Sequence, residues 1–95
     1  MYIIKEENHG GLCVTESLGK GVMWLIKNDW LDGDLEYYDH DTETEYRIKD
    51  IVKGADENPY KIFGYLIKLM AKDGIESAFE WLEHFGFYFS EIEVA

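Results

Sequence analysis

Two short apolar runs open the chain, and polar residues separate them. They are Tyr2-Ile3-Ile4 and Leu12-Cys13-Val14. The segment between them is polar and ends in two consecutive glycines, Gly10 and Gly11. β-Branched and aromatic residues on either side of a glycine-containing turn are typical of paired strands. The pattern therefore predicts a β-hairpin over residues 2–14.

The spacing of apolar residues then changes to the helical period. Over residues 17–28, four apolar side chains follow one another at i, i+4, i+7 and i+8. They are Leu18, Val22, Leu25 and Ile26. This spacing predicts a helix, whose N-cap oxygen can come from Thr15 or Ser17. Gly19 and Gly21 each weaken its first turn by up to about 1 kcal/mol relative to Ala, so we expect either close packing there or fraying.

Two further helices are predicted in the C-terminal half. Asn58-Pro59 marks a helix start, because Asn is a good N-cap and Pro suits the first helical position. The apolar face that follows comprises Ile62, Phe63, Leu66, Ile67, Leu69 and Met70. Asp73, with Glu76 three residues later, resembles a capping box and predicts the start of the next helix. We expect that helix to end near Gly86.

Alternation with a period of two predicts three more strands. Asp34–Tyr38 and Thr42–Lys49 form a second hairpin, with Asp39-His40-Asp41 as its turn. The second of these strands has Thr42, Thr44, Tyr46 and Ile48 on one face and Glu43, Glu45, Arg47 and Lys49 on the other. Aromatic and β-branched residues over Phe87–Val94 predict a closing strand, which could pair with a second copy unless Glu91 and Glu93 charge its edge.

The predicted order of elements is therefore β-β-α-β-β-α-α-β. Short hairpins join the strands, and strands and helices are partly segregated along the chain. This arrangement favours the α+β class: a small, mostly antiparallel sheet with three helices packed on one face. A length of 95 residues predicts one acidic globular domain spanning 1–95.

Charge narrows the range of partners. The chain has 20 Asp and Glu against 9 Lys and Arg, a formal net charge of −11, while 46% of its residues are apolar. Such a protein has enough apolar residues to fold, is repelled by nucleic acid and anionic lipid, and is drawn to cationic surfaces. Its apolar stretches are too short for a membrane span or a signal peptide. The single cysteine, Cys13, suits a buried position and a reducing cytoplasm.

The acidic residues are concentrated in one block that contains no Lys or Arg. Between Asp29 and Glu45 the carboxylates are Asp29, Asp32, Asp34, Glu36, Asp39, Asp41, Glu43 and Glu45. Tyrosines lie among them, and Tyr and Trp are common at the centres of protein interfaces. The predicted partner-binding residues are Trp30, Asp32, Asp34, Glu36, Tyr37, Tyr38, Asp39, Asp41, Glu43 and Glu45. The alternative is an acidic hairpin that only keeps the protein soluble.

The chain has no motif for catalysis, and we expect it not to be an enzyme. The three histidines and Cys13 lack zinc spacing, and Asp32, Asp34, Asp39 and Asp41 do not fit a calcium loop. We therefore predict no catalytic residues, no metal site and no cofactor. A metal-dependent hydrolase is the weakest of the hypotheses left open.

The block could instead imitate a phosphate backbone. Duplex DNA carries one negative charge per about 1.7 Å of its axis, and an acidic hairpin with its flanking acids approaches that density. In charge, size and scarcity of cysteine, the chain resembles the inhibitors that phages and mobile elements direct at host nucleic-acid enzymes. Anti-restriction and anti-CRISPR proteins are examples, and several act as DNA mimics. The resemblance implies a basic protein surface as partner, and no direct binding to nucleic acid or membrane.

An immunity-type or adaptor protein that neutralises a basic toxin or partner is the alternative. It shares the electrostatics of an inhibitor and differs in its target. A monomer and a homodimer are both compatible with the sequence.

Overall fold

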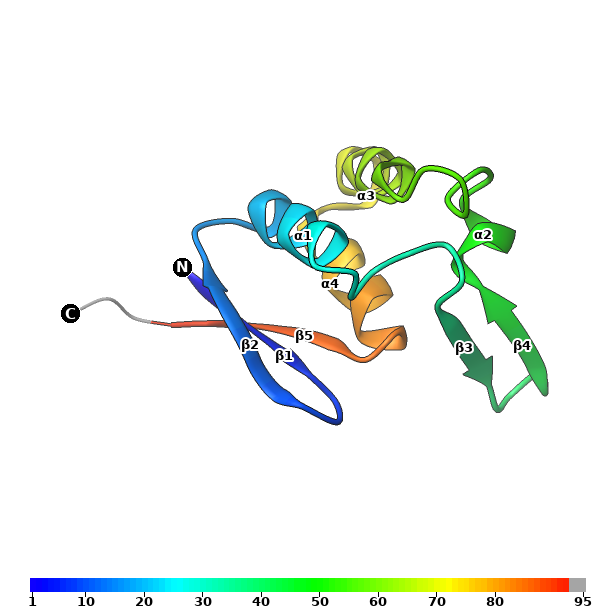
Figure 1. The fold of residues 1–95 in the computed structure, drawn as a ribbon, viewed down its shortest axis with the longest axis horizontal. Helices are drawn as coiled ribbons and strands as arrows, with labels where there is room; N and C mark the ends of the chain where they lie inside the picture. The colour runs from blue at the N-terminus through cyan, green and yellow to red at the C-terminus, as the bar shows by residue number, and fades with distance from the viewer. Residues whose placement is uncertain (93–95) are drawn as a thin grey trace.

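The α+β class predicted from the sequence is confirmed in the computed structural model, which describes residues 1–92 (Figure 1). The elements are β1 (Tyr2–Glu6), β2 (Gly10–Thr15), α1 (Leu18–Lys27), β3 (Glu36–Asp39), β4 (Thr44–Arg47), α2 (Ile48–Ile51), α3 (Tyr60–Asp73), α4 (Ile75–His84) and β5 (Phe87–Glu91). Their order matches the predicted one except for the short α2. In the described part of the chain, none of the helices has the length and apolar character that a membrane span needs.

The first sheet has three antiparallel strands in the order β2-β1-β5. The predicted N-terminal hairpin is confirmed, and the chain's last strand pairs with its first, Tyr2 opposite Glu91. β5 therefore lies at an edge of this sheet. The structure ends the strand at Glu91; Glu93 and Val94, part of the predicted strand, lie outside the described residues.

The second hairpin forms a separate two-stranded sheet, β3-β4, rather than part of one sheet. Both strands are shorter than predicted. Ile48 is buried as the alternation requires, but the chain turns into α2 there. The Asp50 carboxylate accepts a hydrogen bond from the Arg47 backbone N–H (3.0 Å), which satisfies a backbone donor at the start of a helical turn. The turn of the hairpin spans residues 40–43 instead of 39–41.

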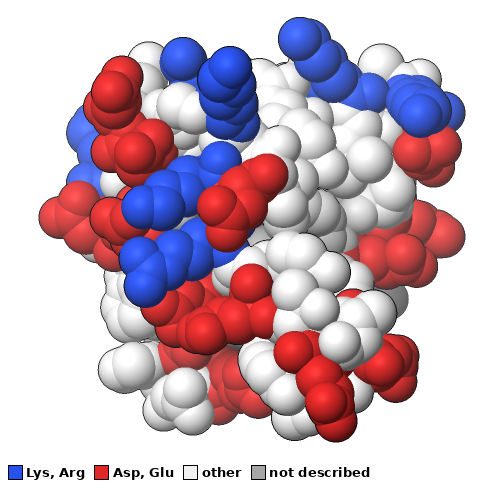
Figure 2. Space-filling view, turned by 90° about the vertical axis from the view of Figure 1, so that its right-hand side faces the viewer, with Lys and Arg blue, Asp and Glu red and all other residues white. Residues whose placement is uncertain are grey.

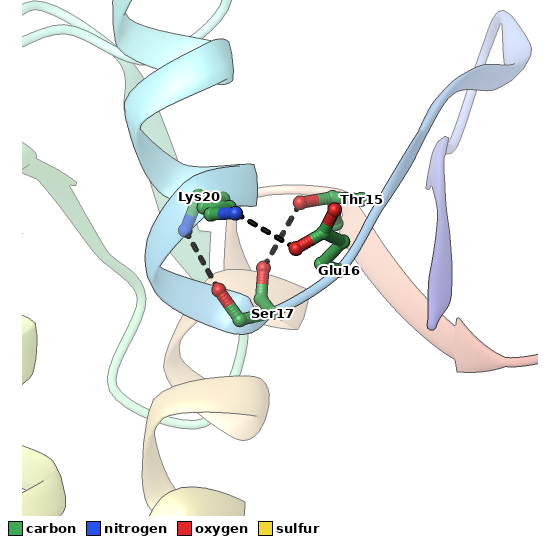
Figure 3. A network of polar contacts seen from close by, with 4 residues as sticks. All are labelled: Thr15, Glu16, Ser17 and Lys20. Carbon is green, nitrogen blue, oxygen red and sulfur yellow. Dashed lines mark hydrogen bonds and ion pairs between the residues drawn. The ribbon is translucent and has the colours of Figure 1, made fainter.

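Helix α1 begins with a side-chain cap (Figure 3). Ser17 Oγ accepts a hydrogen bond from the Lys20 backbone N–H (3.2 Å), so Ser17 is the N-cap. The Thr15 hydroxyl donates to the Ser17 carbonyl (3.1 Å), and Lys20 pairs with Glu16 at 2.8 Å. Close packing in the first turn is also confirmed, because a Cβ at Gly21 would lie 2.6 Å from the Phe89 ring.

The start of α4 differs from the prediction. Asp73 is the last residue of α3, not an N-cap, and Gly74 separates the two helices with φ of 89°. The Ser77 hydroxyl donates to the Gly74 carbonyl (2.6 Å). Glycine takes this left-handed φ without steric penalty, so the chain turns at Gly74. α4 ends at His84, and Gly86, also at φ of 89°, reverses the chain into β5, as predicted.

One apolar core joins the helices to both sheets. Its largest fully buried side chains come from strands, helices and loops alike: Phe87, Ile4, Leu25, Leu31, Ile48, Ile62, Leu66, Leu82 and Val22. Ile48, at the base of the hairpin, is completely buried. The core therefore fixes the base of the hairpin, while its turn stands at the far end of the two strands (Figure 1).

Candidate partner-binding site

The β3-β4 hairpin brings most of the predicted site residues together. In its register Glu36 lies opposite Arg47, and Tyr38 lies opposite Glu45. Residues opposite each other in an antiparallel pair share a face. Glu36, Tyr38 and Glu45 therefore lie on the exposed face, whereas Tyr37 and Asp39 lie on the partly buried one.

Bases from just beyond the acidic block neutralise part of it. Arg47 Nη2 lies 2.8 Å from Glu36 Oε1, and Lys49 Nζ lies 3.3 Å from Asp34 Oδ1. Exposed ion pairs of this kind contribute at most about 1 kcal/mol. Their effect here is to remove two carboxylates from the set that can attract a basic partner.

Two other acids act locally as turn formers. Asp32 Oδ1 accepts the backbone N–H of Asp34, and Asp39 Oδ1 accepts that of Asp41, both at 2.9 Å. Short acidic side chains commonly stabilise turns by such bonds. Asp32 and Asp39 therefore have a structural role whether or not they contact a partner.

Three acids at and beside the hairpin turn stay available. Within residues 1–92, Asp41, Glu43 and Glu45 form no ion pair with a Lys or Arg, and all three are exposed. Figure 2 turns the hairpin side of the molecule toward the viewer, and its lowest part shows Asp, Glu and uncharged residues but no Lys or Arg. The free negative charge is thus concentrated away from the ion-paired base of the hairpin.

Two of the carboxylates on the exposed face interact. A side-chain hydrogen bond with Glu36, together with its negative charge, raises the pKa of Glu45, while Arg47 acts weakly in the opposite direction. Since this pKa lies above that of the same group in the unfolded chain, the interaction stabilises the folded protein at pH values below the ordinary carboxyl pKa. That benefit is lost as the pH rises through the raised value.

We expect Glu36→Gln to lower the pKa of Glu45 toward its ordinary value, because the neighbouring negative charge is removed. An NMR pH titration of the side-chain carboxyl signals measures this. Glu43→Gln is the matched control and should leave Glu45 unchanged. An unaltered Glu45 midpoint in Glu36→Gln would contradict the contact between the two carboxyls.

The aromatic residues of the predicted site have different roles. Tyr37 is half-buried and packs edge-on against His84, with ring centroids 4.9 Å apart. Tyr38 is 47% exposed and lies beside His40 at 4.8 Å. Trp30 precedes the hairpin strands in the chain and packs against the core and the ring of His9. Tyr38 is therefore the available aromatic contact, and Tyr37 attaches the hairpin to α4.

An open groove of about 690 Å³ lies between the hairpin and α4. Its lining residues are Glu36, Tyr37, Tyr38 and His40 from the hairpin, Glu80, Glu83, His84 and Phe85 from α4 and its C-cap, and Glu7 and Tyr88 from the first sheet and its turn. Within residues 1–92, no Lys or Arg lines it. Carboxylates bind guanidinium and ammonium groups, and tyrosine faces attract the same cations, so the groove suits basic side chains.

Of the ten residues that line this groove, only Glu36, Tyr37 and Tyr38 belong to the site predicted from the sequence. Glu7, Glu80, Glu83 and Tyr88 lie far from the acidic block along the chain, and only the fold brings them beside it. A usable signal exists for α4, because Glu80, Glu83 and His84 follow the helical spacing i, i+3, i+4 that places residues on one face.

The arrangement of potential metal ligands and the environment of the thiol bear on two other kinds of chemistry. Within residues 1–92, no three His, Cys, Asp or Glu side chains lie close enough together to hold a metal ion. Burial raises the pKa of the Cys13 thiol, which keeps it protonated and poorly nucleophilic near neutral pH.

Comparisons with protein-family models, curated proteins and solved structures found no match.

Proposed function

We propose that this protein is a non-enzymatic inhibitor that occupies a basic, nucleic-acid-binding surface of a target protein, as phage inhibitors of host defence nucleases do. The observation that carries the proposal is the groove between the hairpin and α4, which no Lys or Arg of residues 1–92 lines. Of its four glutamates, Glu36 pairs with Arg47, whereas Glu7, Glu80 and Glu83 form no ion pair within residues 1–92. Beside the groove, the hairpin turn adds Asp41 and Glu43. The groove and the turn thus both present acidic side chains, and Tyr38 is exposed between them in the sequence of the hairpin.

The charge distribution supports binding by imitation of nucleic acid. A nucleic-acid-binding groove presents Lys and Arg spaced to meet phosphates. The carboxylates lie on two neighbouring elements, the hairpin and α4. They therefore present more than one row of negative charge, as the two phosphate backbones of a duplex do. The net charge of −11 speeds encounter with a basic surface, in a manner that weakens with salt. A target of this kind places the protein in the cytoplasm, which its single thiol suits.

Competition with nucleic acid tests the proposal. The target is first captured with tagged protein at low salt and released at high salt, then identified by mass spectrometry. The purified target is next mixed with its nucleic acid and increasing amounts of this protein in a mobility-shift assay. We expect the nucleic acid to be released, because both ligands use one basic surface.

A stable complex of target, nucleic acid and this protein together would contradict the proposal. Capture of a basic toxin without a nucleic-acid-binding surface would instead support the immunity-type alternative.

A further inference from the structure

A second hollow, of opposite charge, lies between α2 and α3. It has a volume of about 370 Å³ and is lined by Ile51, Val52, Lys53, Lys61, Gly64, Tyr65 and Lys68. Four of these residues come from α3 at the spacing i, i+3, i+4, i+7, which places them on one face of the helix. This volume falls in the range of small-molecule sites, roughly 300–1,000 Å³.

The hollow concentrates positive charge in an acidic protein. Three of the nine Lys and Arg line it, and no Asp or Glu of residues 1–92 does. Lys53, Lys61 and Lys68 form no ion pair with any acid of residues 1–92, although acids outnumber bases two to one in the chain. Figure 2 likewise shows Lys and Arg in the upper and middle parts of the face whose lowest part is acidic. These ammonium groups are available to an anion.

Two glycines shape the hollow. Lys61 lies over Gly54, where a Cβ would stand 2.6 Å from its Nζ, and the φ of +85° at Gly54 also favours glycine. The ammonium group therefore lies close to the backbone of the turn. At Gly64, by contrast, a Cβ would meet no atom within 4 Å, so the missing side chain leaves space on the α3 side.

The lining chemistry selects a phosphate group. All three cations are Lys, which binds phosphate as a compact point charge, whereas flat carboxylates are best matched by the planar fork of Arg. The remaining surface is mainly apolar: Ile51 is 41% exposed, and the half-buried Tyr65 packs against Trp81. An apolar or aromatic group attached to the phosphate would cover this surface.

We propose that the hollow binds a small phosphate monoester whose organic part is apolar or aromatic. The site is distinct from the acidic groove and does not depend on the proposed inhibitor function. The phosphate lies among the three ammonium groups, and the organic part lies against Ile51 and Tyr65.

NMR titration of the isotope-labelled full chain tests this site. The probes are inorganic phosphate, phenyl phosphate, AMP and citrate, at constant ionic strength. We expect saturable shifts of the Gly54, Gly64 and Tyr65 amide signals with phenyl phosphate or AMP, at least about tenfold tighter than with inorganic phosphate. The preferred monoester identifies the organic part. Citrate binding as tightly as both monoesters would overturn the phosphate assignment.

Two variants and a control locate the site. The double change Lys61→Gln, Lys68→Gln should weaken monoester binding at least about tenfold. Gly64→Glu should abolish binding, because its side chain fills the space and its carboxylate repels the negatively charged phosphate. Lys5→Gln, Lys27→Gln removes the same charge elsewhere and should leave binding intact. Chemical-shift changes that do not saturate in the wild-type protein would overturn the proposal. Equal losses of monoester affinity in the two lysine double variants would also overturn it.

Discussion

The triple variant in which Asp41, Glu43 and Glu45 are all changed to Lys is expected to bind the target at least about 100-fold more weakly. Each replacement changes the local charge by two units and turns attraction to a basic surface into repulsion. The three residues are exposed, and none holds the hairpin together by a side-chain ion pair with a Lys or Arg of residues 1–92. Affinity is measured by calorimetry against the captured target, and folding by thermal melting.

Neighbouring acids are unsuitable for this experiment. Asp32 and Asp39 accept backbone hydrogen bonds in turns, and Asp34 and Glu36 pair with Lys49 and Arg47. Their replacement would disturb the hairpin as well as the charge, so a loss of binding would have two explanations.

A control variant separates a local site from the effect of net charge. Asp56, Glu57 and Asp73, changed together to Lys, alter the total charge by the same amount but lie outside the groove. We expect this variant to lose only the long-range part of the attraction, a few-fold at low salt and less at high salt. Equal losses in both variants would show that the hairpin is not the binding site.

The hairpins and main helices could be predicted because their periodicity agrees with the observed packing. The exceptions occur where one local contact overrides the pattern. Ile48 is buried either as a strand residue or as the first residue of α2, so alternation alone does not reveal the turn that Asp50 stabilises. The pair Asp73 and Glu76 fits a capping box, yet α3 continues through Asp73 and the chain turns only at Gly74.

The acidic hairpin was visible in the sequence, but the groove was not. Its second wall depends on Tyr37 packing against His84 and Phe85, a contact between distant parts of the chain. The neutralisation of Glu36 by Arg47 likewise follows from strand register. Composition thus indicated the sign of the charge at the site, whereas tertiary packing determines which carboxylates remain free.

At Gly33, the base of the acidic hairpin closely approaches the backbone of residues 55–56. Gly33 is buried, and a Cβ there would lie 2.3 Å from the Asp56 backbone nitrogen and 2.5 Å from the Ala55 carbonyl carbon. Its carbonyl also accepts the Lys49 N–H (2.9 Å) beyond the hairpin's second strand. Gly33 therefore lies where the base of the hairpin meets the turn that precedes α3.

Gly33→Ala is expected to lower the free energy of unfolding by about 3 kcal/mol or more, because backbone atoms cannot rotate away from the added methyl group. The hairpin base and the 55–56 segment must then separate, which also displaces the wall of the acidic groove. Denaturant unfolding measures the stability. Target affinity of the protein that remains folded measures the displacement.

Gly64→Ala provides the matched comparison, since it adds the same methyl group where no atom lies within 4 Å. In the middle of α3, it should raise stability by up to about 1 kcal/mol through helix propensity. If the free energy of unfolding of Gly33→Ala were within about 0.5 kcal/mol of the wild-type value, the close backbone contact would be contradicted. The position of the hairpin would then depend on the packing of Tyr37 and Ile48 alone.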